Sequence, residues 1–408
     1  MWSQAGLDVR PAWQTSTVRT IGVTERQARL ARRHRIAPGQ RAGDVVEATS
    51  DLVCLHATDP ATIFLSAWAR VDGLKVGDLE QALYSDRSLV KHLAMRRTLF
   101  VFPRATLPYA QAGASDRVAD TERRRLIRDV EKAGLHRDGE GWLTSAAEAV
   151  VDALTDEREA SSTELRQEIP LLEGSISYGE GKKWGGEVPV GPRVLTTLSA
   201  AGRIVRGTNA GGWTASRPRW TSMTSWLGEE LPTVDEAEGV AGLVEQWLRA
   251  FGPGTAADIK WWLGSTVRAV RQALADLDAV EVDLDGQTGY LLPDDLDPVE
   301  PVEPWIALLP MLDPTTMGWQ QREWYLGPHK AQLFDRAGNA GPTIWCDGRI
   351  VGGWRQHEDG EVELQLLEDV GADAKAAIEA EAARLTGWLD GTRVLPRFPS
   401  PLWRAERA

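Results

Sequence analysis

Residues 51–70 read Asp-Leu-Val-Cys-Leu-His-Ala-Thr-Asp-Pro-Ala-Thr-Ile-Phe-Leu-Ser-Ala-Trp-Ala-Arg, and this stretch is the most informative part of the chain. A short apolar run ends in a polar cluster of His56, Thr58 and Asp59. Pro60 follows, and then a second apolar run begins. Because proline fits the first turn of a helix, we expect Asp59 to be its N-cap and Pro60 its first residue. The pattern is typical either of a capping turn with an incidental histidine or of a reaction site beside a helix N-terminus.

The composition indicates a globular chain without metal chemistry. With 408 residues, 42% hydrophobic and 26% charged, two to four structural units are expected. No apolar run approaches the length of a membrane span, and the N-terminus does not look like a signal peptide, so we expect a cytoplasmic protein. Cys54 and Cys346 are the only cysteines, and no two histidines stand at metal-ligand spacing. We therefore expect no disulfide framework, no metal and no cofactor.

The charge is unevenly distributed. The formal net charge of −13 argues against a polyanionic partner. Basic residues nevertheless dominate residues 19–41, 87–104 and 182–219, whereas residues 276–303 hold acids and no base. Because exposed charges are screened beyond roughly 10 Å at ordinary salt, a nucleic acid responds to the local patch and not to the total. The pattern favours DNA binding by the N-terminal half; separate solvated faces are the alternative.

Two segments share one order of elements, three helices followed by a β-hairpin. In the first segment we expect a helix at 145–154, a short helix that starts at the capping signal of 161–165, and a third helix at 190–201. Strands at 203–206 and 213–215 follow. In the second we expect helices at 240–251, 255–262 and 265–277, with strands at 280–284 and 289–292. The turn of the second hairpin contains Asp285-Gly286, a strong hairpin signal. This order is that of a winged helix.

A looser copy of the pattern precedes these segments, and a different composition follows them. The looser copy has expected helices near 26–33, 42–55, 61–71 and 76–85 and a strand at 98–102. After a proline-rich boundary the chain is β-rich to residue 367 and helical at 372–389. We expect an α+β fold of three tandem winged-helix units and a C-terminal β-rich domain with a terminal helix. The expected limits are 1–24 for a flexible N-terminus, 25–140, 141–228 and 238–300 for the units, and 304–408 for the last domain.

Winged helices commonly bind duplex DNA through the third helix and the hairpin, or wing. In the middle unit Arg193 lies on the third helix, and Arg206, Arg217 and Arg219 flank the wing. These residues are expected to contact the DNA backbone. The wing of the last unit is acidic at 281–285, which favours a protein scaffold role for that unit.

Four stretches together resemble the AlkZ/YcaQ-like DNA glycosylase family. The His-Ala-Thr-Asp-Pro of 56–60 and the Trp-Ala-Arg of 68–70 are similar to its Gln-x-Gln-Asp-Pro…Ala-Arg segment. The Met-Arg-Arg-Thr-Leu-Phe of 95–100 is similar to its Met-Arg-Gly-Thr-Leu-His. The Leu-Leu-Pro-Met-Leu-Asp-Pro of 308–314, with Gly318 and Arg322, resembles its Leu-Leu-Pro-x-Phe-Asp-Pro…Gly…Arg block. The Asp-Gly-Arg-Ile-Val-Gly-Gly-Trp of 347–354 matches its Asp-Gly-x-x-x-Gly-x-Trp strands.

The resemblance implies a C-shaped scaffold of tandem winged helices that binds double-stranded DNA with alkylated bases. It implies a monofunctional glycosylase that hydrolyses the N-glycosidic bond of bulky N7-alkylated purines, or unhooks crosslinks, in DNA repair or genotoxin self-resistance. The chain departs from the family pattern at the chemistry. Family members position water with Gln-x-Gln or Gln-x-Asp, where this chain has His56 and Thr58, and the family's later histidine is Phe100 here.

An N7-alkylpurine is a good leaving group, so the reaction needs a positioned water and stabilisation of a cationic sugar. With an unperturbed pKa near 6.5, His56 orients that water or accepts its proton, and the pH–rate profile should show a limb near this pKa. Thr58 offers a hydroxyl to the same water. Asp59 is expected to stabilise the sugar, to cap the helix, or both.

The remaining candidates are expected to hold DNA. Arg96 and Arg97 would bind phosphates beside the lesion, and Arg32, Arg33 and Arg35 would extend the basic surface. Lys182, Lys183 and Trp184 lie in a glycine-rich loop, expected to be mobile, where the indole either stacks on a base or anchors the loop. The alternative to an enzyme is a non-catalytic winged-helix DNA-binding protein or regulator. A regulator needs a dimerisation element, for which the chain offers only weak candidates, and we expect a monomer.

Overall fold

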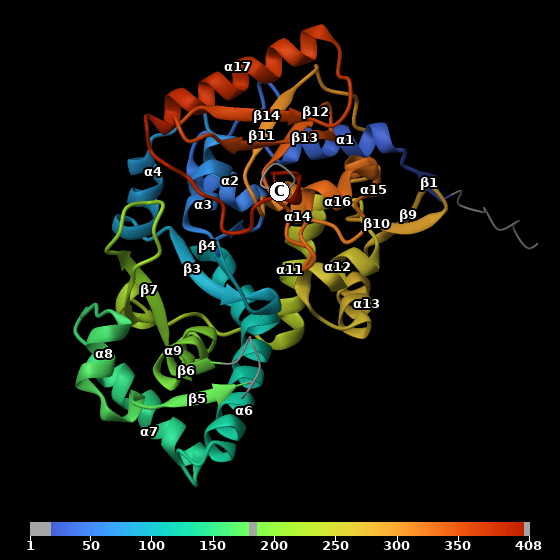
Figure 1. The fold of residues 1–408 in the computed structure, drawn as a ribbon. Helices are drawn as coiled ribbons and strands as arrows, with labels where there is room; N and C mark the ends of the chain where they lie inside the picture. Colours follow the sequence, from blue (N-terminus) through green and yellow to red (C-terminus); the bar gives the residue numbers. More distant parts are fainter. Residues whose placement is uncertain (1–17, 179–185, 404–408) are drawn as a thin grey trace, which may run out of the picture.

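The computed structural model describes residues 18–178 and 186–403 of the chain (Figure 1). The polypeptide combines helices with five small sheets, as an α+β fold requires. No helix in the described ranges is long and apolar enough to cross a membrane.

The N-terminal part packs short helices around a three-stranded antiparallel sheet of order β2-β4-β3. Its elements are β1 (Arg19–Thr20), α1 (Val23–Arg33), α2 (Val45–Asp51), β2 (Leu55–His56), α3 (Pro60–Trp68), α4 (Val76–Glu80), β3 (Leu89–Ala94), β4 (Thr98–Pro103) and α5 (Leu107–Ala110). The sequence analysis predicted β4 and helices α1 to α4, but it did not predict β3 or α5, and it placed Leu55 of β2 in a helix. Residues 19–24, assigned there to a flexible N-terminus, form β1 and the start of α1.

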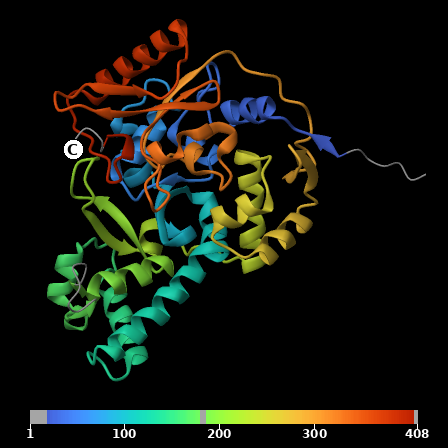
Figure 2. The same ribbon diagram turned by 45° about the vertical axis from the view of Figure 1, so that its right-hand side comes forward.

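The second segment forms a lobe with a hydrophobic core of its own, built from residues between Leu126 and Trp220. Its elements are α6 (Asp116–Lys132), α7 (Gly139–Ala153), α8 (Ser162–Glu168), β5 (Ser175–Tyr178), β6 (Gly186–Pro189), α9 (Val190–Ala200), β7 (Ile204–Asn209), β8 (Pro218–Ser222) and α10 (Met223–Leu227). Figures 1 and 2 both show the lobe extending away from the rest of the molecule. The expected helices and capping signal are present, and Ser161 caps α8 in a capping box.

The second strand of this lobe is not where the sequence analysis placed it. Residues 213–215 belong to the loop between β7 and β8, and the strand is Pro218–Ser222. The Asn209 side chain explains the difference, because it closes the loop from within. Its Nδ2 donates to the Ala215 carbonyl over 2.8 Å, and its Oδ1 accepts from the Arg217 N–H over 2.7 Å. The loop backbone therefore bonds to this amide and not to a neighbouring strand.

The third segment has the expected order of helices and hairpin. It comprises α11 (Glu236–Phe251), α12 (Ala256–Leu263), α13 (Val267–Asp276), β9 (Val280–Leu284) and β10 (Gln287–Leu291). Asp285 and Gly286 take positive φ angles of 51° and 87°, the conformation that a tight hairpin turn needs. Strand β1 pairs with β9 in parallel and extends this sheet to three strands.

The C-terminal segment is a four-stranded antiparallel sheet, in sequence order, covered by the long helix α17 (Figure 1). Its elements are β11 (Ile306–Leu309), α14 (Pro314–Met317), α15 (Glu323–Leu326), α16 (Lys330–Leu333), β12 (Thr343–Cys346), β13 (Arg349–Gln356), β14 (Val362–Leu366) and α17 (Ala372–Leu389). The expected β-rich region and terminal helix are confirmed. One large hydrophobic core joins this segment to the first and third segments, from Leu30 to Trp403. The domain limits of the sequence analysis stay a prediction.

Candidate active site

His56 lies on the edge strand β2, opposite Phe100 of β4. Its ring meets the Phe100 ring edge-on, with 5.3 Å between centroids, and the residue is 9% exposed. The Thr58 backbone N–H donates to His56 Nδ1 over 3.4 Å. Because Nδ1 is the acceptor, neutral His56 carries its hydrogen on Nε2. Among the described residues Nε2 has no protein partner, and it is not sealed from solvent.

The expected pKa of His56 is wrong. Burial, and then the positive charge of Arg96, lower the pKa of His56 to about 3. The imidazole is therefore neutral throughout the physiological range, and no rate limb near pH 6.5 follows from it. With hydrogen on Nε2, neutral His56 presents a hydrogen-bond donor, as an amide N–H does, and not a basic nitrogen.

Asp59 caps α3 as expected. Its Oδ1 accepts from the Ala61 N–H over 3.0 Å, and Pro60 occupies the first turn. Its Oδ2 accepts from the Arg397 N–H over 3.2 Å, which ties the C-terminal segment to the candidate site. Burial raises the Asp59 pKa, and the N–H donors oppose this shift. Arg397 carried no signal in the sequence, since 338 residues separate it from Asp59.

Thr58 is half-buried between His56 and Asp59. Its backbone N–H bonds to His56, whereas its hydroxyl makes no hydrogen bond to any residue in the described ranges. The hydroxyl is thus free to bind a water. Residues 56–59 therefore bring together the ring N–H of His56, the free hydroxyl of Thr58 and the helix-capping carboxylate of Asp59.

Arg96 and Arg97 form the three-residue turn between β3 and β4 with Met95. Both have left-handed backbone angles, with φ of 53° and 60°, which cost energy in any residue but glycine. The family pattern has glycine at the position of Arg97. Arg97 pairs with Glu122 of α6 over 3.0 Å, and Arg96 stacks on Trp261 of α12.

The family's histidine position, Phe100, has a histidine on each side. His56 on β2 and His92 on β3 both pair with Phe100 across the sheet, so the three side chains share one face. His92 is fully buried, and burial lowers its pKa to about 4. The imidazoles of this site therefore stand on the two strands that flank β4, and not on β4 itself.

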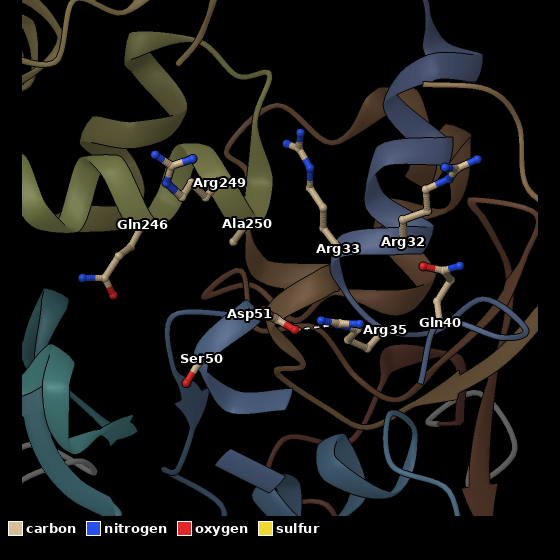
Figure 3. Close-up of a pocket in the computed structure, with 9 residues that line it drawn as sticks. All are labelled: Arg32, Arg33, Arg35, Gln40, Ser50, Asp51, Gln246, Arg249 and Ala250. Atoms are coloured by element: carbon tan, nitrogen blue, oxygen red, sulfur yellow. Dashed lines mark hydrogen bonds and ion pairs between the residues drawn. The ribbon is translucent and has the colours of Figure 1, made fainter. Parts of the chain in front are cut away.

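Arg32 and Arg33 of α1, and Arg35 just after it, face acids or carbonyl groups. They line a pocket of about 420 Å³ between α1, α2 and α11 (Figure 3). Arg33 pairs with Asp295 over 2.5 Å, and Arg35 pairs with Glu47 over 2.7 Å and with Asp51 over 2.5 Å. Arg32 is exposed and donates to the Glu300 carbonyl over 3.0 Å. Asp295, which neutralises Arg33, belongs to the acidic segment 276–303. The surface around these arginines therefore carries less positive charge than residues 19–41 alone suggest.

The DNA-binding candidates of the middle segment also include arginines that are paired with acids and one that is not. Arg193 pairs with Asp129 over 2.9 Å, and Arg219 with Glu164 over 3.3 Å. Arg217 is exposed, without a side-chain partner among the described residues. Arg206 stacks on Trp220 and lines a cavity of about 20 Å³ together with Ala57 and Pro60, so the hairpin adjoins the 51–70 stretch.

Lys182, Lys183 and Trp184, with the loop that holds them, lie outside the described residues. Their proposed roles rest on the sequence alone.

The Ala-Arg motif of residues 69–70 and the Asp-Pro motif of residues 313–314 meet inside the core. Arg70 forms a bidentate ion pair with Asp313, with Nη2–Oδ1 and Nη1–Oδ2 distances of 2.7 and 2.9 Å, and neither side chain is exposed. Asp313 also caps α14 through the Thr315 N–H. These motif residues therefore fasten the first segment to the C-terminal one.

A search of protein-family models matches residues 49–388 to the DNA glycosylase AlkZ-like family. The chain belongs to this family. An interstrand DNA cross-link repair glycosylase from Streptomyces sahachiroi is 26% identical over 314 residues, which cover 74% of this chain and 79% of that protein. The solved structure of the Streptomyces sahachiroi DNA glycosylase AlkZ is similar with a TM-score of 0.70 and 20% identity, covering 92% of this chain and 99% of that one. The second likeness establishes the fold, and the match to the family confirms the resemblance found in the sequence. On the described residues, no group of three or more histidine, cysteine or acidic side chains is placed to hold a metal ion.

Proposed function

We propose that this member of the AlkZ-like family is a monofunctional DNA glycosylase that acts on bulky N7-alkylated purines, or on crosslinks, in duplex DNA. The observation that carries the proposal is the hydrogen bond from the Thr58 N–H to His56 Nδ1. The Thr58 N–H fixes Nδ1 as an acceptor, so the unpartnered Nε2–H is available to orient a water. A glutamine N–H supplies the same kind of donor in the family pattern.

The proposed division of labour follows from the surroundings. His56 and the Thr58 hydroxyl position the water. The Asp59 carboxylate, held by two backbone N–H donors, stabilises the positive charge that develops on the sugar as the base leaves. Arg96, which has no acid partner within residues 18–178 and 186–403, holds the DNA backbone. The remaining arginines do so where DNA phosphates displace their acidic partners.

We infer that the enzyme needs neither metal nor cofactor, because an N7-alkylated purine already leaves as a neutral base. We also propose that it acts as a cytoplasmic monomer, and that the Gln-x-Gln change reflects a particular adduct, in repair or in self-resistance to a genotoxin.

The test is incubation of the protein with duplexes that contain N7-methylguanine or a bulkier N7-alkylguanine. An active enzyme leaves abasic sites, revealed as strand breaks only after alkali. His56→Ala should lose most excision but keep its affinity for duplex DNA, and Thr58→Ala should lose less. His56→Gln, combined with Thr58→Gln, should retain part of the activity.

One observation favours a second function. Both water-positioning residues of the family pattern are replaced, at His56 and Thr58. A protein that binds alkylated duplexes tightly, yet releases no base from any of them, would be a non-catalytic DNA-binding member of the family.

A further inference from the structure

Two arginines far apart in the sequence stack on one tryptophan beside the candidate site. The guanidinium carbon of Arg96 lies 4.1 Å from the Trp261 ring centroid, and that of Arg322 lies 4.7 Å from it. Arg96 comes from the β3–β4 turn, Trp261 from α12, and Arg322 from the residue before α15. Three segments thus gather two like charges on one indole.

Neither guanidinium has an acidic partner. Within the described ranges no carboxylate lies at ion-pair distance from Arg96 or Arg322. Arg322 uses its Nε to donate to the Trp319 carbonyl over 2.7 Å, and its Nη atoms make no hydrogen bond there. Those Nη atoms are not sealed from solvent, although the residue is 6% exposed. The Nη atoms of Arg322 are therefore hydrogen-bond donors without a partner among the described residues.

The backbone is built to keep Arg96 in this place. Arg96 has a left-handed conformation, with φ of 53° and ψ of 30°. Gly264, which ends α12 with φ of 62°, lies against the Arg96 side chain, and a Cβ at Gly264 would be 2.9 Å from Arg96 Cγ. Strained conformations of this kind persist where surrounding structure imposes them, often at binding sites.

The two charges influence one another and His56. Desolvation of the guanidinium, and then the nearby Arg322, lower the pKa of Arg96 to about 10, so Arg96 stays charged at neutral pH. The charge of Arg96 in turn helps to lower the pKa of His56, and both residues belong to the β2-β4-β3 sheet, His56 on β2 and Arg96 in the turn between β3 and β4. Trp261 offsets part of the repulsion, because an aromatic face attracts cations.

We propose that Arg96 and Arg322, which both stack on Trp261, bind one backbone phosphate of duplex DNA at the turn between β3 and β4. Paired guanidinium groups match the oxygens of a phosphodiester, and one negative charge relieves their mutual repulsion. The choice of a DNA phosphate rests on the proposed function. This site positions the DNA strand and takes no part in bond breaking.

The first experiment measures the affinity of Arg96→Gln, Arg322→Gln and the double variant for an undamaged duplex as a function of salt. Each single variant should bind about tenfold more weakly, and its slope of log K against log salt should fall by at most about 0.9, the value for one phosphate contact. Because both residues hold the same phosphate, the double variant should lose about 0.9 of slope in total. Losses that add to about 1.8 would assign the arginines to separate phosphates and overturn the proposal.

A matched control is Arg158→Gln, which removes the same charge from an arginine already paired with Glu168 over 2.6 Å. Its salt slope should stay that of the unmodified protein. Arg322 also stacks on Phe334, so thermal unfolding of each variant separates misfolding from lost contact.

The second experiment does not depend on the Arg322 variant. Neutral methylphosphonates replace single phosphates of the duplex, one position at a time. The duplex carries one N7-alkylguanine whose 2′-fluorinated sugar resists cleavage of the glycosidic bond. The unmodified protein should lose affinity at one position near this lesion, and Arg96→Gln should be insensitive at that position alone. Equal sensitivity of both proteins at every position would overturn the proposal. Because this base is not released, the result is independent of whether the protein is an active glycosylase.

Discussion

The charge of a family-motif arginine helps to lower the pKa of two histidines, and the two sites differ in one component. Arg70, which acts on His34, pairs with the buried Asp313, whereas Arg96, which acts on His56, has no acid partner among the described residues. Both histidines have a pKa lowered to about 3. The carboxylate closes the first site, and its absence leaves the second one open to a ligand.

The closed site satisfies all its polar atoms internally. His34 Nε2 donates to the Ala250 carbonyl over 3.1 Å, and its Nδ1 accepts from the Thr315 hydroxyl over 2.8 Å. Thr315 in turn accepts from Arg70 over 2.7 Å. Such a network stabilises the joint between segments and offers nothing to a substrate. The comparison teaches that the partners of a motif arginine, and not its charge alone, show whether its role is structural or ligand-binding.

The largest expected effect is a loss of folding stability at acidic pH, which tests whether His34, His56 and the buried His92 are held neutral. His34, His56 and His92 have folded pKa values of about 3, 3 and 4, below the unfolded value near 6.5. Between pH 6 and 4 the unfolded chain therefore binds more protons, and stability is lost as the pH falls. The three histidines together contribute up to about 4 kcal/mol per pH unit. Urea unfolding at pH 7, 6 and 5 measures this, and a free energy of unfolding that stays constant would contradict it.

The second prediction breaks the closed site at its acid. Asp313→Ala leaves Arg70 buried and unpaired, which should lower the free energy of unfolding by about 3–5 kcal/mol. Arg96→Ala, at the open site, should change it by less than about 1 kcal/mol, since no ion pair is lost. Denaturant unfolding of both variants provides the measurement. Similar losses in the two proteins would mean that Arg96 is as structural as Arg70.

A smaller effect is expected at the turn of the open site. Arg97→Gly relieves a left-handed conformation worth about 1 kcal/mol, but it leaves the buried Glu122 without its cation. Combining it with Glu122→Gln removes that cost. The double variant should be more stable than the unmodified protein by about 1 kcal/mol in the same assay. A destabilised double variant would show that the turn holds no strain.

Sequence reasoning succeeded where a signal is local. The Asp59 cap, the Pro60 start, the turn at Asp285-Gly286 and helix α17 depend on residues a few positions apart, and all are found. It failed at the second strand of the β7–β8 hairpin, because the Asn209 side chain reorganises the loop. No pattern predicted β3 either.

The site was only half accessible from sequence. His56, Thr58 and Asp59 are adjacent in the chain, so their grouping could be predicted. The lowered pKa of His56, the Arg397 contact to Asp59 and the stack of Arg96 and Arg322 on Trp261 depend on residues that tertiary packing alone brings together. The count of arginines in 19–41 misled for the same reason, since the acid that neutralises Arg33 lies 262 residues away.

The central claim is that His56 acts as a neutral donor that orients the attacking water. Single-turnover excision of an N7-alkylguanine, measured from pH 5.5 to 8 with the unmodified protein and with His56→Ala, tests it most directly. The account predicts a rate independent of pH over this range, because the His56 pKa is about 3, and a much slower His56→Ala protein with an equally flat profile. A limb near pH 6.5 that disappears in the variant would show that His56 acts as a base. Equal rates in the two proteins would remove His56 from the reaction.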